Sequence, residues 1–339
     1  SLTGVGFRPD WIWYKHRSIG YGHATYDSSR SDGSVSNNVY TITSGENREK
    51  HLRVDNTLQE GGYDDLYGTL TSFDADGITI ARGDASGTES AFFNNNGSTV
   101  VGWNWKVNGG TTSTNSDGNE DSTVQVNSDA GISIVLWTGG SNVQTHTFGH
   151  GLGAKPAMII HKRRSSTSNW SIWHQLVSSP NDNYLIWDTT AAANGSTSWE
   201  QPTSTVFQRY IGSSGENWVS YVFKEVEGYS RFGGYKGNGS TDGPFAYTGF
   251  RPAFLMIKKT SGTGNWCVFD NKRNPTNAVN LMMLADTADN ESAGGTGDNL
   301  DFLSNGFKIR DNSSGRNGNG ATYIYMAFAE QPFKFSNAK

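Results

Sequence analysis

One phrase occurs three times in this chain, and it constrains the fold more than any other feature. A basic residue and a proline are followed by a mostly apolar run that ends on a lysine. The three copies are Arg8–Lys15, Lys155–Lys162 and Arg251–Lys258. A phrase repeated at this scale predicts tandem copies of one structural unit, so the repeat is considered before any individual side chain.

The similarity continues beyond the phrase. Pro156 and Pro252 are separated by 96 residues, as are Trp170 and Trp266, so the second and third copies are in register. The first copy has residues 24–27 at the second element and lacks its tryptophan. The elements are short, rich in β-branched and aromatic residues, and separated by Gly, Asn, Asp and Ser, which is typical of strands and turns.

These patterns predict an all-β protein made of three tandem antiparallel β-sandwich repeats of jelly-roll or concanavalin-like character. No stretch of a dozen residues carries a convincing helical stripe. We place the first repeat at 1–110, a polar linker at 111–130, the second repeat at 131–228 and the third at 229–339.

The first repeat differs from the others at its start. The second and third each have a lead-in strand before the phrase, at 131–137 and 229–235, whereas the first has none. We therefore expect this chain to be part of something longer, and a gap in the first sandwich that preceding residues or a neighbouring subunit fill by strand addition.

Two dipeptides predict hairpins. Asp76-Gly77 and Asn305-Gly306 lie between apolar runs, and we expect each to form the two central residues of a tight turn, where positive φ is required. The second repeat lacks such a dipeptide before Val206, so its turn must differ.

Composition excludes several classes. Charged residues are 17% and the formal net charge is −5, which argues against direct nucleic-acid binding. Aromatic residues are 12%, as expected for a globular chain. Cys267, the single cysteine, lies in an apolar run and is predicted to be a core residue. No run of 18 apolar residues predicts membrane insertion, and no signal peptide is visible.

The acidic residues that recur between repeats have a structural explanation. Asp27 and Asp270 match, but the second repeat has His174 there, so a shared turn is favoured over a catalytic pair. The recurring strand-end acids predict side-chain turn caps; they are Asp55, Asp188 and Asp286. We therefore expect no catalytic residue, no enzyme activity and no cofactor.

One loop is rich in possible metal ligands. The segment Asn115–Asp121 gathers oxygen-bearing side chains, yet its spacing does not match a calcium-binding loop and it falls in the predicted linker. A solvated acidic loop is the favoured interpretation, so no metal site is predicted, although calcium binding stays open.

Aromatic side chains are the candidates for sugar contacts, because their flat apolar faces suit sugar rings. Most tryptophans lie on repeat-matched strands, where core packing is the favoured role; these are Trp11, Trp13, Trp103, Trp105, Trp170, Trp173 and Trp266. Trp199 is not matched between repeats. With Tyr63 and Tyr235 it forms our set of candidate ligand contacts.

The repeated elements resemble tandem β-sandwich repeats in tail-fibre-like and other virion structural proteins of tailed, especially marine, bacteriophages. The residues that carry the likeness are Thr248–Lys259, Asn265–Asp270 and Tyr323–Glu330, and through the three copies it covers most of the chain. The resemblance implies a virion-surface or tail adhesion role and transfers no catalytic residues.

On this basis we expect a non-enzymatic virion component, a tail fibre, spike or surface-fibre segment that contacts a host glycan or protein. Its partners would be other virion proteins, with a homo-oligomer, a trimer by family analogy, as the assembly. A capsid decoration or assembly protein without receptor binding is the first alternative. A glycan-active enzyme on the same scaffold is the second.

Overall fold

The computed structural model describes most of the chain. The described residues are 1–30, 33–36, 39–42, 50–61, 68–81, 93, 95–140, 144–177, 183–195, 201–211, 215–293 and 299–331. Within them the chain is all-β with antiparallel sheets, as predicted, apart from the short helix α1 (Ser314–Asn317). We call 1–110, 131–228 and 229–339 the first, second and third segments.

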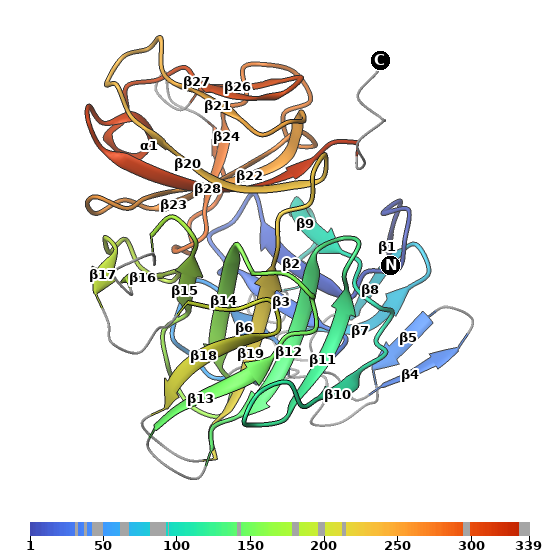
Figure 1. Ribbon diagram of the computed structural model, residues 1–339. Coiled ribbons are helices and arrows are strands. Elements are labelled where there is room, and N and C mark those ends of the chain that lie inside the picture. Colours follow the sequence, from blue (N-terminus) through green and yellow to red (C-terminus); the bar gives the residue numbers. More distant parts are fainter. Residues whose placement is uncertain are drawn as a thin grey trace.

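The first segment contributes two sheets (Figure 1). One follows the order β6 (Leu52–Arg53), β3 (Ala24–Asp27), β2 (Trp11–His16) and β9 (Val100–Trp105). The other follows the order β1 (Leu2–Thr3), β8 (Gly77–Ala81), β7 (Thr69–Asp74), β5 (Val39–Ile42) and β4 (Gly33–Ser36).

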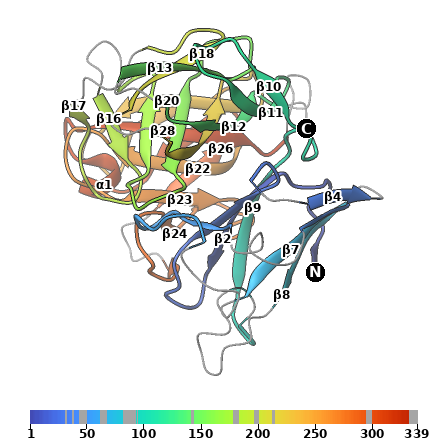
Figure 2. The ribbon, with the colours of Figure 1, turned by 90° about the horizontal axis from the view of Figure 1, so that it is seen from below.

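The second segment provides most of the largest sheet. Its order is β10 (Ser113–Asn115), β11 (Ser122–Asn127), β12 (Ile132–Thr138), β19 (Asn217–Phe223), β14 (Met158–Arg163), β15 (Ser171–His174), β16 (Asn183–Ile186) and β17 (Asn194–Gly195). A second layer pairs β13 (Gln144–Gly149) with β18 (Val206–Ile211). Figure 2 separates this green-to-yellow segment from the blue-to-teal first segment.

The third segment also has two layers. The larger sheet has the order β20 (Ser230–Lys236), β28 (Thr322–Ala329), β22 (Pro252–Lys259), β23 (Trp266–Asp270), β24 (Leu281–Leu284) and β25 (Ser292–Ala293). The smaller sheet has the order β21 (Phe245–Tyr247), β27 (Gly306–Ile309) and β26 (Leu300–Leu303).

The expected linker at 111–130 carries two strands instead. β10 and β11 lie within it, and β11 pairs along its whole length with β12. The polar composition misled the prediction, because one face of this ribbon is exposed while Val124 on the other face is buried in the second segment. Alternation of buried and exposed residues is normal for an edge ribbon of an antiparallel sheet.

The three copies of the phrase form β2, β14 and β22, which lie inside their sheets. Each pairs on one side with the next strand of its segment and on the other with the closing aromatic strand: β9, β19 or β28. Nearly all their side chains are buried, which explains why the phrase is apolar almost throughout.

The two predicted hairpins form, but the glycines do not occupy the turns. Asp74 pairs with Gly77 and Leu303 with Gly306, so each glycine is the first residue of the returning strand. A Cβ on Gly77 would lie 2.0 Å from the Leu2 carbonyl oxygen, and one on Gly306 would lie 2.2 Å from that of Ala246. Glycine is required there because β1 and β21 approach closely.

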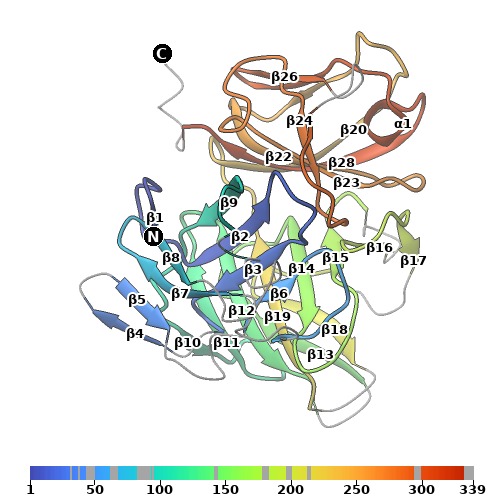
Figure 3. The ribbon, with the colours of Figure 1, turned by 180° about the vertical axis from the view of Figure 1, so that it is seen from behind.

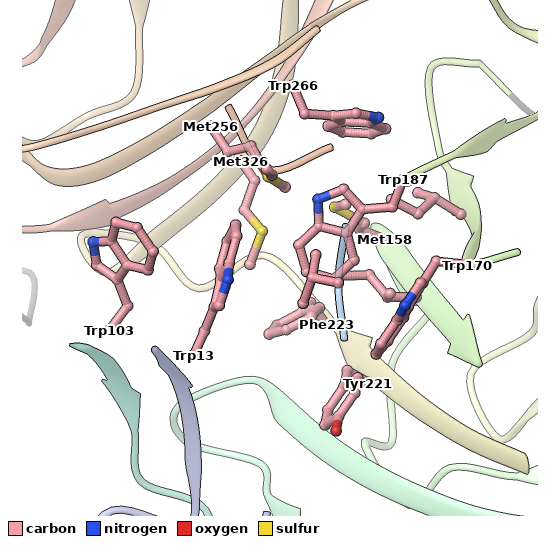
Figure 4. Packing of buried hydrophobic residues seen from close by; sticks show 14 of the residues in the cluster. Trp13, Trp103, Met158, Trp170, Trp187, Tyr221, Phe223, Met256, Trp266 and Met326 are labelled. Atoms are coloured by element: carbon pink, nitrogen blue, oxygen red, sulfur yellow. The ribbon is translucent and has the colours of Figure 1, made fainter. Parts of the chain in front are cut away.

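One hydrophobic cluster joins the three segments. Side chains from all three of the larger sheets converge on it, as Figure 4 shows for Trp13, Met158 and Met256. The seven repeat-matched tryptophans predicted to be core residues are buried, and so is Cys267. Shared burial of large apolar surface makes the segments parts of one body.

Candidate functional site

Three buried lysines mark the junctions between segments. They end the repeated phrase, and each ammonium group donates to a backbone carbonyl of the preceding segment in a cyclic order. Lys162 Nζ lies 3.1 Å from Thr57 O, Lys258 Nζ lies 3.0 Å from Thr190 O, and Lys15 Nζ lies 3.3 Å from Ala288 O. The third segment therefore contacts the first as the first contacts the second, and the three junctions close a ring.

Burial lowers the pKa of Lys15, Lys162 and Lys258 to about 8. An aspartate of the same segment opposes this shift in each case: Asp55, Asp188 or Asp286. A buried ammonium needs hydrogen-bond acceptors, and the carbonyls supply them. The same environment at all three positions indicates a structural function for the lysine.

A ring nitrogen makes a second bond at every junction. Trp170 Nε1 donates to Arg53 O at 2.7 Å and Trp266 Nε1 donates to Ile186 O at 2.9 Å. In the first segment the matched residue is His23, whose Nε2 lies 2.9 Å from Leu284 O. The histidine thus replaces the tryptophan that this repeat lacks.

The recurring strand-end acids receive these same residues. Asp188 Oδ1 accepts the backbone N–H of Trp170, Asp286 Oδ1 accepts that of Trp266, and Asp55 Oδ1 accepts that of His23. The prediction that they cap their own turns was incomplete, because they also bond across to a neighbouring strand. Burial raises the pKa of Asp188 and Asp286.

Asp27 and Asp270 cap turns, as predicted. Asp27 Oδ1 accepts the backbone N–H groups of Ser29 and Arg30, and Asp270 accepts the equivalent pair. The second oxygen of each binds an arginine three residues later and a ring donor of another segment, Tyr221 for Asp27 and Trp103 for Asp270. Both acids are committed to structure.

Sequence reasoning missed two glutamates at the junctions. Glu60 joins Arg30 of its own segment, at 2.6 Å, to Arg164 of the second segment, at 2.8 Å. Glu291 similarly joins Arg273 to Arg17. The available signal was positional, because each glutamate follows a recurring aspartate by five residues and each cross-junction arginine follows a phrase lysine by two.

The predicted ligand contacts do not form one site in the described structure. Trp199 and Tyr63 lie outside the described residues. Tyr235 lies in β20, half-buried, with Tyr323 stacked on one face of its ring at 5.0 Å between centroids. Its hydroxyl donates to Arg316 O at 2.8 Å, and burial raises its pKa.

The oxygen-rich loop is held by internal bonds. Asn115 and Asp117 bond to each other, while Asn119 exchanges hydrogen bonds with Thr147 of β13. Within the described residues, no group of three or more His, Cys, Asp or Glu side chains is placed to hold a metal ion. In the same part of the chain, no helix has the length and apolar character needed to cross a membrane.

A polar groove of about 610 Å³ lies beside this loop. Its lining combines amide, hydroxyl, carboxylate and guanidinium groups: Thr114, Asn119, Glu120, Asp121, Ser122, Thr123, Leu136, Trp137, Thr138, Arg164 and Asn217. Glu120 pairs with the buried His146 at 3.0 Å, and Arg164 is held by Glu60. Such a set of planar and hydroxyl side chains can bond a polyhydroxylated ligand.

A second groove, of about 680 Å³, is more apolar and lies along β9. Trp103, Trp105 and Val101 form one wall, and Phe254 and Phe328 of the third segment form another. In Figures 1 and 3, β9 lies next to the strands β22 and β28. Asp270 and Glu330 also line the groove, and each is paired with an arginine.

Comparison with known proteins places the chain in a family. A family described as "Domain of unknown function (DUF7483)" matches residues 1–332, nearly the whole chain. The chain belongs to this family. No curated protein and no solved structure matches it. Membership in DUF7483 therefore fixes relationship without supplying an activity.

Proposed function

We propose that this DUF7483 chain is a non-enzymatic virion structural protein, a tail-fibre, spike or surface-fibre segment that contacts a host-surface glycan or protein. The polar groove beside β11 is the observation that carries the binding part of this proposal. Its amide and hydroxyl groups suit the hydroxyls of a sugar, whose many weak bonds fix orientation. The resemblance to tail-fibre-like repeats supports the virion location.

The non-enzymatic part rests on how the recurring acids are used. Asp27 and Asp270 are each bonded to an arginine and to turn N–H groups, and such occupied carboxylates are poor general acids. Glu120 and Asp121 share the polar groove, so an enzyme acting on glycans remains the alternative that the test must address.

The experiment is a glycan array probed with the full chain. We expect saturable binding to a bacterial envelope glycan, and weaker binding by Glu120→Gln and Asp121→Asn. Asp242→Asn, an exposed residue of the third segment outside this groove, is the control and should bind normally. Release of shorter oligosaccharides would support the enzyme, and absence of any glycan binding would favour a decoration protein.

Assembly is tested separately. The trimer expected by analogy would be an arrangement of whole chains, because the three junctions described above close within one chain. We propose a homo-oligomer on the virion surface. Light scattering of the purified chain gives its mass, and immunogold electron microscopy of particles distinguishes a tail position from a capsid position.

A further inference from the structure

The outer edge of β9 is the starting point. The matched strands β19 and β28 each pair on this edge with an antiparallel lead-in strand, β12 and β20 respectively. Among the strands of the described residues, none pairs with the outer edge of β9. There the carbonyl of the exposed Gly102 accepts a bond from the side chain of Asn104 at 3.0 Å.

The groove beside this edge matches the place that a lead-in side chain fills elsewhere. Phe232 of β20 lies 5.5 Å from Phe223 and 6.1 Å from Phe328 between ring centroids. By strand register, the equivalent rings at the junction of the third and first segments are Phe328 and Trp105. They lie 5.7 Å apart and both line the groove.

The backbone of β20 is held by a side-chain clamp from the second segment. Glu225 Oε1 accepts the N–H of Phe232 at 3.1 Å, and Gln175 Nε2 donates to the Phe232 carbonyl at 2.8 Å. Gln175 also donates to Glu225 at 3.2 Å, which fixes both side chains. The clamp therefore satisfies both polar groups of one residue of the added strand.

The same clamp stands at the groove beside β9 without a strand. Asn271 and Glu330 occupy the positions of Gln175 and Glu225, and Asn271 Nδ2 donates to Glu330 Oε1 at 2.8 Å. Asn271 is buried, and its Oδ1 has no hydrogen-bond partner. Arg251 binds the other oxygen of Glu330 at 2.7 Å and holds that carboxylate in place.

We propose that the edge of β9 and this groove bind an extended strand of another polypeptide chain, antiparallel to β9. A large apolar side chain opposite Trp103 fills the space between Trp105 and Phe328, while Glu330 and Asn271 bind the backbone of that residue. Backbone pairing supplies affinity and the apolar pocket supplies selectivity, as in other strand additions. The inference goes beyond the proposed glycan contact and does not depend on it.

The test uses the full chain and a synthetic peptide with the sequence of residues 227–237, which contains β20. We expect saturable binding by calorimetry, a change in tryptophan fluorescence, and slower amide exchange at 101–105. Glu330→Ala should weaken binding about tenfold or more, because a hydrogen bond to a carboxylate is lost. Asp242→Asn is again the control and should leave binding unchanged.

Two altered peptides sharpen the result. Replacing Phe232 with alanine should weaken binding through the lost pocket contact, and methylating the backbone nitrogen of Phe232 should weaken it by removing the N–H that Glu330 accepts. No binding at about 1 mM peptide, or binding insensitive to both Glu330→Ala and the methyl group, overturns the proposal. Binding that appears only after deletion of 332–339 also overturns it, since the chain would then fill its own groove.

Discussion

His23 Nε2 lies 2.9 Å from the carbonyl oxygen of Leu284, although 261 residues separate them in sequence. Trp13 Nε1 donates to His23 Nδ1 at 2.9 Å, so Nδ1 is the acceptor and Nε2 carries the hydrogen that Leu284 receives. This contact joins the third segment to the first, where the other junctions use a tryptophan.

His23→Ala should therefore destabilise the chain more than a simple truncation. It leaves the indole N–H of Trp13 and the carbonyl of Leu284 without partners in a buried region, and we expect a loss of about 3 kcal/mol in unfolding free energy. Trp170→Phe is the comparison, since it removes one N–H and should cost about 1–2 kcal/mol. Urea unfolding measures both. Equal losses would contradict the double role of His23.

Gly22 and Arg53 should behave as a coupled pair. Where the other segments have Asn169 and Asn265 donating to an aspartate, the first has Gly22, and Arg53 donates to Asp55 instead. A Cβ on Gly22 would lie 1.5 Å from Arg53 Nη2. Gly22→Asn alone should cost about 1–3 kcal/mol in unfolding free energy.

The double variant Gly22→Asn with Arg53→Leu recreates the arrangement of the third segment, where Leu284 stands at the arginine position. It should recover most of the stability that Gly22→Asn loses. A double-mutant cycle in urea gives the coupling energy, and a value near zero would show that the two positions act independently.

Glu60 should be a point of high sensitivity, because it binds the fully buried Arg30 and the cross-junction Arg164. Glu60→Ala leaves both guanidinium groups without this partner, and we expect a loss of about 3 kcal/mol in unfolding free energy. Glu60→Gln keeps the shape and some hydrogen bonds and should cost less. The exposed Glu227→Ala serves as the control; a loss as large as that of Glu60→Ala would count against the network.

The three junction lysines predict an alkaline dependence of stability. Their pKa falls from the ordinary 10.5 to about 8 on folding, so between these values the unfolded chain holds protons that the folded chain has released. Raising the pH through this window therefore favours the folded state, by about 1.4 kcal/mol per pH unit for each lysine.

Lys162→Met should remove about one third of that slope between pH 8 and 10, below the range in which Tyr229, whose pKa is raised to about 12, opposes it. The exposed Lys155→Met is the control and should keep the full slope. Unfolding free energies at pH 8, 9 and 10 provide the measurement. An unchanged slope in Lys162→Met would refute the assignment.

Much of the fold follows from local patterns. Short β-branched runs, turn residues and the repeated phrase predicted strands and buried tryptophans, because burial on both faces of a central strand demands apolar residues throughout. The segment 111–130 was predicted as a linker since its polar residues mask the buried face of β11, whose one buried apolar side chain, Val124, gives a weak pattern.

The sequence alone determined that this chain is all-β and that its recurring aspartates have structural functions. Only the tertiary structure decided which segment each of them contacts. Lys15 with Ala288 and Glu291 with Arg17 join the two ends of the chain, and no local pattern encodes such pairs. Ring closure depends on shared burial of side chains from three segments, so the contacts exist only when all three sheets are packed together.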